Sequence, residues 1–270
     1  MPADWGRARG DEDLERKSQP ERDEKEEFVY SVFQDIAPNY DRMNSILSFG
    51  RHKVWRQFTM KKIGLRPGQK ALDVCCGTCD WTIGLAKEVK AEGHVFGLDF
   101  SPKMLEVGQR KLEQAHVAER VTLVEGNAMR LPFEDNVFDV ATIGFALRNV
   151  PDWRAVLREM LRVVKPGGKV VSLELSHPPS PLFRWFYLLY FQRILPVMGK
   201  VFAGQYQQYR WLPQSLEDFP NAKELQQAMQ EIGFARVDCY LLNGGIAAVH
   251  IGIKNDSAKE SGGNGRQNDR

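Results

Sequence analysis

The chain has 270 residues, of which 43% are hydrophobic and 27% charged, and this composition suits one large globular domain. Its formal net charge of +2 is too small to indicate a nucleic-acid partner, and no apolar run reaches the roughly 18 residues of a membrane-spanning helix. The four cysteines form no spaced disulfide framework and the charged N-terminus is unlike a secretory signal, so we expect a cytoplasmic protein.

Both ends of the chain are unsuited to a folded core. Residues 1–27 contain six Lys or Arg and ten Asp or Glu, and residues 255–270 are rich in Gly, Ser, Asn and charged residues. Such segments bury too little apolar surface to offset the entropy that is lost on ordering. We therefore predict two disordered tails around a single folded domain at residues 28–254.

The folded part alternates short apolar runs with amphipathic helices. Helices are predicted to begin near Trp81, Ser101, Asp152 and Asn221. This alternation predicts an α/β fold with a doubly wound, mostly parallel sheet. The Asn243-Gly244-Gly245 link favours a hairpin, so one of the last two strands should run antiparallel. The predicted strands are 70–74, 93–99, 121–124, 137–145, 169–175, 236–242 and 246–253.

Three loops at the ends of the first three strands indicate a cofactor that contains adenosine. Gly77 follows the first strand, where a glycine lets the backbone approach a ligand closely. Asp99 ends the second strand, and a carboxylate at this place can accept both hydroxyls of a ribose. Asn127 and Ala128 follow the third strand, where a side chain can contact the adenine edge.

The composition of the first loop favours S-adenosylmethionine over a dinucleotide. NAD binding needs the pattern G-x-G-x-x-G, whose backbone N–H groups hold a pyrophosphate, but Gly77 stands alone here. Asp73 and Asp80 add negative charge, which suits a cofactor that carries a sulfonium and an ammonium group. The structural alternative is that Gly77 only makes a turn and Asp99 only caps the helix that begins near Ser101.

Cys76 and Cys79 have the spacing of half a zinc or redox site. Such a pair supplies only two ligands, and no second Cys/His pair at zinc spacing accompanies it. We therefore expect no metal, and we interpret these cysteines as small apolar groups that pack around the cofactor.

The most informative motifs lie on either side of these loops. The first comprises Tyr40–Asn44, Leu47, Ser48, His52 and Trp55, and the second comprises Arg162–Gly168, Glu174 and Ser176. They resemble the two signatures of the ubiquinone/menaquinone biosynthesis C-methyltransferase family, and residues 144–150 and 244–250 are also similar to it. The resemblance covers residues 28–254. The loop at residues 73–82 most resembles the Gram-positive demethylmenaquinone methyltransferases of that family.

The resemblance implies a class I, Rossmann-like methyltransferase fold with seven strands. It implies transfer of a methyl group from S-adenosylmethionine to a ring carbon of reduced demethylmenaquinone, which gives menaquinone. It also implies cofactor contacts at Thr78, Asp99, Asn127 and Ala128. Many relatives have a serine where this chain has Gly144, so that side-chain contact is not expected here.

Residues 181–203 are dense in Leu, Phe, Trp and Tyr and include Arg184 and Arg193. They could cover a hydrophobic pocket or form a helix in peripheral contact with the inner face of the membrane. The alternative is an ordinary buried helix. Residues 40–55 can form a lid over the cofactor. A homodimer is the other partner that we consider.

We expect catalysis to involve Arg148, Asp80 and Tyr40. Arg148 follows the fourth strand and can stabilise a phenolate through a charged hydrogen bond, unless it only pairs with Asp152. The proton acceptor could be Asp80, Tyr40 or one of two histidines, at positions 52 and 177, and the sequence does not rank them. Two other functions stay open: methylation of a sterol, fatty acid or small phenol, and a non-catalytic adenosine-binding scaffold.

Overall fold

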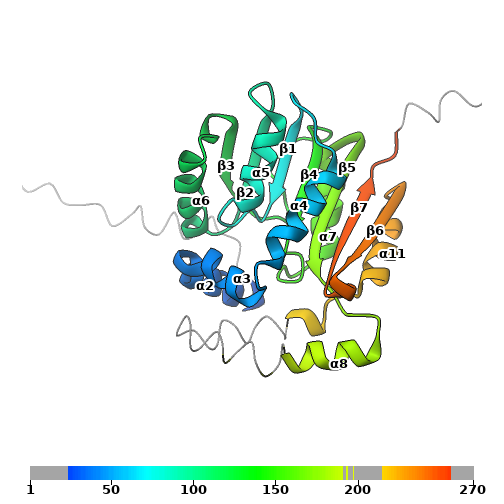
Figure 1. Cartoon of the computed structure of the whole chain (residues 1–270). Coiled ribbons are helices and arrows are strands. Elements are labelled where there is room, and N and C mark those ends of the chain that lie inside the picture. The colour runs from blue at the N-terminus through cyan, green and yellow to red at the C-terminus, as the bar shows by residue number, and fades with distance from the viewer. Residues whose placement is uncertain (1–23, 191–192, 194–196, 198–214, 257–270) are drawn as a thin grey trace, which may run out of the picture.

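The computed structural model describes residues 24–190, 193, 197 and 215–256 of the chain. Seven strands form one sheet in the order β3-β2-β1-β4-β5-β7-β6 (Figure 1), which confirms the predicted fold class. β7 pairs antiparallel with both β5 and β6, while β1 to β5 pair in parallel, so the single antiparallel strand is also confirmed. The strands are β1 Lys70–Val74, β2 His94–Asp99, β3 Val121–Glu125, β4 Phe138–Gly144, β5 Val164–Leu175, β6 Arg236–Leu242 and β7 Ala247–Ile253.

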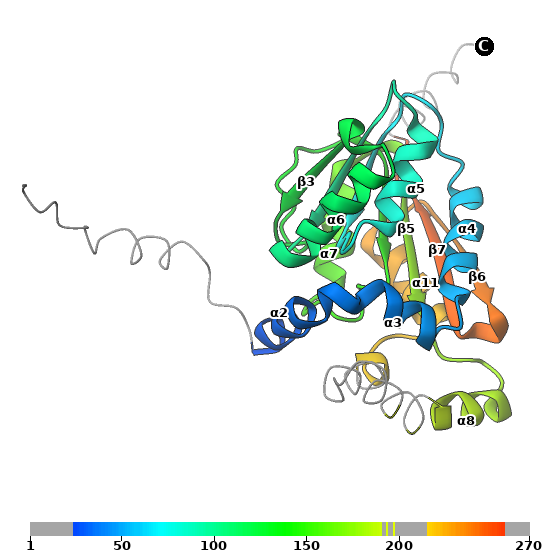
Figure 2. The same ribbon diagram turned by 60° about the vertical axis from the view of Figure 1, so that its left-hand side comes forward.

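Helices cover both faces of this sheet (Figures 1 and 2). One face carries α4 (Arg51–Ile63), α5 (Asp80–Val89) and α6 (Pro102–Gln114), and the other carries α7 (Trp153–Val163) and α11 (Ala222–Ile232). Each face has its own apolar cluster, because strands with helices on both sides are buried on both sides. The strand order reverses between β1 and β4, and a ligand crevice is expected beside that point.

Three of the predicted helix starts are capped by side chains, as the sequence indicated. The Ser101 hydroxyl accepts the N–H of Met104 at 3.3 Å, and the Asp152 carboxylate accepts the N–H of Ala155 at 2.9 Å. Asn221 forms a capping box with the residue three positions later. These caps fix where α6, α7 and α11 begin and therefore how the loops before them leave the sheet.

The hairpin between β6 and β7 forms at the predicted link, in a short helical turn, η4 (Asn243–Gly245). Gly244 has a φ of 72°, and a Cβ at this position would lie 2.9 Å from the Phe183 ring. Phe183 belongs to α8 (Pro181–Leu189), so this glycine lets the hairpin and α8 approach each other.

The N-terminal helices cross the carboxyl ends of the parallel strands (Figure 2). They are α2 (Glu24–Ile36), η1 (Ala37–Asn39) and α3 (Tyr40–Leu47). Residues 24–27, which the sequence predicted as part of the tail, belong to α2. Acidic residues are stabilising in a first helical turn, although they made this stretch resemble a tail. The rest of the two predicted tails, 1–23 and 257–270, lies outside the described residues.

α8 lies beyond the N-terminal helices, at the same end of the sheet (Figures 1 and 2). Its Tyr187 is buried against Met43 and Leu47 of α3, and the Tyr190 hydroxyl donates to the Leu47 carbonyl at 2.9 Å. The remainder of the predicted 181–203 segment lies largely outside the described residues. In the described part of the chain, no helix is long and apolar enough to cross a membrane.

Candidate active site

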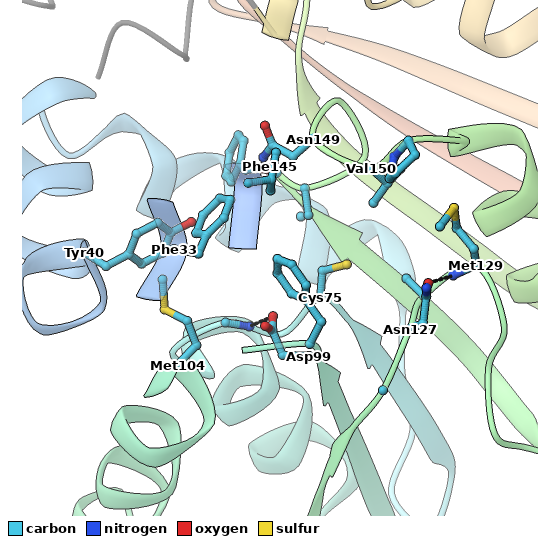
Figure 3. A pocket seen from close by; sticks show the side chains of 18 residues that line it. Phe33, Tyr40, Cys75, Asp99, Met104, Asn127, Met129, Phe145, Asn149 and Val150 are labelled. Carbon is cyan, nitrogen blue, oxygen red and sulfur yellow. Dashed lines mark hydrogen bonds between the residues drawn. The ribbon is translucent and has the colours of Figure 1, made fainter. Parts of the chain in front are cut away.

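A cavity of about 730 Å³ lies where the strand order reverses (Figure 3). The loops after β1, β2 and β3 form one side of it, and α2 and α3 form the other. Four of the five predicted cofactor residues line this cavity: Gly77, Asp99, Asn127 and Ala128. The structure therefore brings together residues that are up to about 50 positions apart in the sequence.

Asp99 holds two loops of this cavity in place. Its carboxylate accepts the N–H of Gly77 at 2.8 Å and the N–H of Ser101 at 2.9 Å. Burial raises the pKa of Asp99 to about 6, although these backbone hydrogen bonds act in the opposite direction. The structural role considered from the sequence is thus real, and the same carboxylate also faces the cavity (Figure 3).

Thr78 is placed differently from the other predicted cofactor residues. It does not line the cavity, and its hydroxyl donates to the Asp41 carboxylate at 2.6 Å. Lys111 also donates to the Thr78 hydroxyl, at 3.3 Å. Thr78 therefore links the first loop to α3 and α6.

A second cavity of about 1620 Å³ lies between α2, α3, α4 and α8. Its lining is mainly apolar and aromatic. Four residues line both cavities and form a shared wall: Phe33, Tyr40, Phe145 and Asn149. The two cavities therefore adjoin at these four residues, which Figure 3 labels among the residues that line the first cavity.

Phe145 has a left-handed backbone, with a φ of 59°, which is rare for an aromatic residue. Hydrogen bonds hold it there: its N–H donates to the Leu173 carbonyl at 2.8 Å, and its carbonyl accepts from Arg148 at 2.8 Å. Such strain concentrates at functional sites. Here it directs the Phe145 side chain to the wall between the two cavities.

Arg148 is buried, lines the second cavity and pairs with Glu174 of β5. The expected alternative partner was Asp152, which instead caps α7, so that assignment is wrong. Nη1 of Arg148 makes the contacts to Glu174 and to the Phe145 carbonyl, while Nε has no hydrogen-bond partner in the described structure. The guanidinium is thus held through Nη1, and its Nε–H remains a hydrogen-bond donor without a partner in the described structure.

Asp80 and Tyr40 differ in their access to the cavities. Burial would raise the pKa of Asp80, but Arg56, at 2.5 Å, and Lys111 outweigh it and lower that pKa. Asp80 lines neither cavity, so a role as proton acceptor gains no support from its position. Tyr40 lines both cavities, and burial raises its pKa, which keeps the phenol protonated. His177 lines neither cavity, and its ring nitrogen lies 3.0 Å from the Leu216 carbonyl.

The cysteines and Gly144 are packing positions. Cys75 lines the first cavity, Cys76 and Cys79 are buried, and the described residues contain no cluster that could hold a metal. A Cβ at Gly144 would lie 2.6 Å from the Trp81 ring, so that ring occupies the space of the serine that many relatives have.

Sequence reasoning missed the contribution of α2, whose Phe33 lies in the shared wall, and the pairing of Glu174 with Arg148. Glu174 carried a signal, because it is an acidic residue in the otherwise uncharged run at residues 170–175. Asn149, which lines both cavities, was not singled out from the sequence either.

Comparison with known proteins agrees with this geometry. Residues 21–254 match the model of the ubiE/COQ5 methyltransferase family. The chain is 54% identical to a demethylmenaquinone methyltransferase of Alkalihalophilus pseudofirmus over 230 residues, which are 85% of this chain and 97% of that protein. It is also 54% identical to a protein of the same name from Bacillus cereus, over 86% of this chain and 98% of that one. A solved SAM-dependent methyltransferase from Aquifex aeolicus shares the fold, with a TM-score of 0.55 and 17% identity over 73% of this chain and 88% of that one.

Proposed function

The chain belongs to the ubiE/COQ5 methyltransferase family, and we propose that it methylates a ring carbon of reduced demethylmenaquinone to give menaquinone. The methyl donor is S-adenosylmethionine. The observation that carries the proposal is the meeting of two cavities, the first lined by the buried carboxylate of Asp99 and the second large and mainly apolar. This arrangement suits a donor and a lipid acceptor that react across a short gap.

The first cavity fits the donor. Asp99, Gly77 and Asn127 all line this cavity. In this proposal, Asp99 would accept the ribose hydroxyls, the backbone at Gly77 would contact the methionine part, and Asn127 would contact the adenine edge. When bound, the cofactor supplies an electrophilic methyl group on a sulfonium. Thr78 is not among the residues that we propose for binding, because its hydroxyl is engaged by Asp41 outside the cavity.

The second cavity fits the acceptor. Aromatic and aliphatic side chains from α2, α3, α4 and α8 would surround a naphthoquinol ring and the first part of its isoprenoid chain. A quinone ring is electron-poor, so the reactive form is the quinol. Its phenol has an ordinary pKa of about 10, and loss of that proton increases electron density on the adjacent ring carbon.

Arg148 is the residue that we propose to stabilise the negative oxygen of the quinol. Its pairing with Glu174 fixes the guanidinium and also offsets part of its charge. A phenolate in the second cavity could accept a hydrogen bond from the unpaired Nε–H of Arg148. Tyr40, on the shared wall and protonated, would orient ring and methyl donor rather than accept a proton.

A methyl-transfer assay tests the function. Labelled S-adenosylmethionine and demethylmenaquinone are incubated with the enzyme, with and without dithionite. We expect labelled menaquinone only under reducing conditions. Equal rates on quinone and quinol would contradict the phenolate mechanism, and reaction with a sterol, a fatty acid or a small phenol but not with the quinol would contradict the proposed acceptor. No transfer to any of them would favour the scaffold alternative.

We also propose that the mouth of the second cavity contacts an anionic phospholipid surface. Phe49 and Phe186 line this cavity and are 74% and 56% exposed, so the cavity reaches the surface between the α3–α4 turn and α8. Trp185, which is 59% exposed, extends this apolar rim. Three exposed basic residues lie on the adjoining helices, Arg51 and Lys53 at the start of α4 and Arg184 on α8. Each basic residue near an anionic membrane is worth about 1 kcal/mol.

Sedimentation with lipid vesicles tests this contact. We expect binding to vesicles that contain phosphatidylglycerol and much weaker binding to pure phosphatidylcholine. Leu182→Ser with Trp185→Ser changes two exposed residues that do not line the cavity, and it should abolish vesicle binding while the methylation of a short-chain quinol continues. Equal sedimentation of parent and variant would exclude this rim as the contact. A cytoplasmic location with peripheral attachment at the inner face of the membrane follows from this proposal, and a homodimer remains a prediction.

A further inference from the structure

His52 on α4 carries a buried polar atom that the fold does not use. The residue is 4% exposed and lines the second cavity. Its Nε2 is buried and has no hydrogen-bond partner among the described residues. Most buried polar atoms in native proteins are paired, so an unpaired one beside a cavity indicates a ligand atom as its partner.

The hydrogen bonds on the other side of the ring define the tautomer. The Ser48 hydroxyl donates to the Asn44 carbonyl at 2.6 Å, and the same oxygen lies 2.6 Å from Nδ1 of His52. A serine hydroxyl has a single hydrogen, so Ser48 must accept from Nδ1. Nδ1 therefore carries the ring proton, and Nε2 has a free lone pair.

The surroundings keep this imidazole neutral. Burial lowers the pKa of His52 to about 4, and the charge of Arg56 acts in the same direction. Lys53 lowers the pKa further, whereas Asp80 and Asp41 oppose these effects. At neutral pH, Nε2 consequently carries an unprotonated lone pair with no partner among the described residues.

The position of His52 along α4 places it on the side of the shared wall. Trp55 lies three residues later, and residues at this spacing share a helix face. The Trp55 ring lies 6.2 Å from the Phe145 ring, and its indole N–H donates to Asn243 at 2.6 Å, which anchors the helix. His52 thus belongs to the part of the second cavity where the reacting ring would lie.

We propose that Nε2 of His52 accepts the proton of the quinol hydroxyl next to the carbon that is methylated. This inference rests on the proposed function. The ring carbon forms a bond to the methyl group, the carbon–sulfur bond breaks with its electron pair on sulfur, and the hydroxyl proton passes to Nε2. The ring carbon then loses its own proton to solvent, which restores the aromatic quinol, and protonated His52 returns the first proton to the product oxygen. The balance is one methyl transferred and one proton released.

A weak base suffices for this step. The hydroxyl oxygen gains carbonyl character as the carbon–carbon bond forms, so its proton becomes far more acidic than that of a phenol. Arg148 stabilises the oxygen as the proton leaves it. General-base assistance of this kind typically accelerates a reaction by about 10²–10⁴-fold.

The test removes the imidazole of His52 by substitution and then adds free imidazole to the solution. His52→Ala should lower kcat by about 100-fold while the KM for quinol and the Kd for S-adenosylmethionine change by less than about threefold. Added imidazole should restore much of the lost kcat. Pyrrole has a similar shape and an N–H but no basic lone pair, and it should restore none. A side chain that only fills space would be replaced equally well by both molecules.

Two variants serve as controls. His52→Asn can keep an N–H donor towards Ser48 but has no atom at Nε2, so it should lose as much kcat as His52→Ala, which keeps the test decisive if the alanine variant fails to fold. His250→Gln changes another buried histidine, one that lines neither cavity, and kcat should not change.

Three results would overturn the proposal: a kcat within about threefold of the parent in folded His52→Ala or His52→Asn, rescue by pyrrole, or no rescue by imidazole. All of these presuppose that the parent enzyme methylates the reduced quinone. Failure of the parent itself would contradict the proposed function, and would thereby be distinguished from failure of the His52 step.

Discussion

The two cavities are built in different ways. The first is formed largely by loops at the ends of neighbouring strands, and backbone hydrogen bonds to Asp99 hold two of these loops together. The second is formed mainly by side chains of helices that lie beyond the edge of the sheet. The first therefore depends on the sheet, whereas the second depends on how α2, α3, α4 and α8 pack.

We expect the two cavities to have different roles: donor binding in the first and selection of the acceptor in the second. The first cavity, the proposed donor site, lies at the strand ends of a fold that this chain shares with a solved structure at only 17% identity. The acceptor cavity uses the N-terminal helices and α8, and these segments would determine which acceptor is methylated. Substitutions in the two regions should consequently affect different measurements.

The largest effect is expected in the second cavity, at Arg148. Arg148→Ala should lower turnover by about 10²–10³-fold, as is typical for loss of a donor to a developing oxyanion. It also leaves Glu174 buried without its partner, which should reduce the free energy of unfolding by about 3–5 kcal/mol. Assays of the reduced quinone and denaturant titrations measure the two effects.

A double variant separates those effects. Arg148→Ala with Glu174→Gln removes both charges, so most of the stability should return while turnover stays low. Recovery of turnover together with stability would show that Arg148 acts only through folding. Turnover at the parent rate in Arg148→Ala itself would remove Arg148 from the reaction altogether.

Asp99 tests the first cavity. Asp99→Asn should weaken S-adenosylmethionine binding by about 1.5–3 kcal/mol, the scale of a lost charged hydrogen bond, with little effect on the KM for quinol. Calorimetry on a variant that keeps its melting temperature makes the measurement. Unchanged affinity would show that Asp99 only holds the loops at Gly77 and Ser101.

The raised pKa of Asp99 makes a linked prediction about pH. Ribose hydroxyls donate to the ionised carboxylate, so cofactor affinity should fall as the pH decreases through about 6. The sign for stability is opposite, because a folded pKa above the unfolded value of 3.8 means that ionising this buried group costs stability as pH rises from about 4 to 6. Asp73 also has a pKa of about 6 but lines neither cavity. Asp99→Asn should therefore remove most of the pH dependence of binding.

A smaller effect is expected at Gly144, where donor cavity and core meet. Gly144→Ser would place its Cβ 2.6 Å from the Trp81 ring, and overpacking of this kind costs about 1–3 kcal/mol. Thermal unfolding of the variant measures that cost. Gly144→Ser in combination with Trp81→Leu should recover stability, because the smaller side chain leaves space. A fully stable Gly144→Ser enzyme would show that the Trp81 ring moves aside freely.

The donor cavity was largely predictable from the sequence, and the acceptor cavity was not. Gly77, Asp99 and Asn127 each follow a strand, and parallel strands bring their carboxyl ends to one edge, so local pattern and topology suffice. Residues that meet only when helices pack give no such signal. Phe33 was therefore missed. The pairing of Arg148 with Glu174 on the adjacent strand was missed as well, because Asp152 was the only pairing partner considered as an alternative.

The N-terminus shows the same limit. Composition placed the start of the domain at residue 28, because charge dominates residues 24–27. In the structure, α2 begins at Glu24 and buries Val29, Val32 and Ile36 along one side. Composition averages over a segment, whereas burial depends on which face of the helix each residue occupies.

Two deletions that differ by 13 residues test where the folded domain begins. The shorter one should have the smallest effect of all the changes considered. Removal of residues 1–23 and 257–270 should change the free energy of unfolding by less than about 0.5 kcal/mol, because polar segments of this composition contribute little to a core. Extending the first deletion to residue 36 removes α2 and with it Val29 and Phe33 from the wall of the donor cavity. Cofactor affinity and melting temperature should then fall together. Loss of both on the shorter deletion alone would mean that the tail packs on the domain, and unchanged cofactor affinity after the longer one would mean that the sheet loops hold the donor without help from α2.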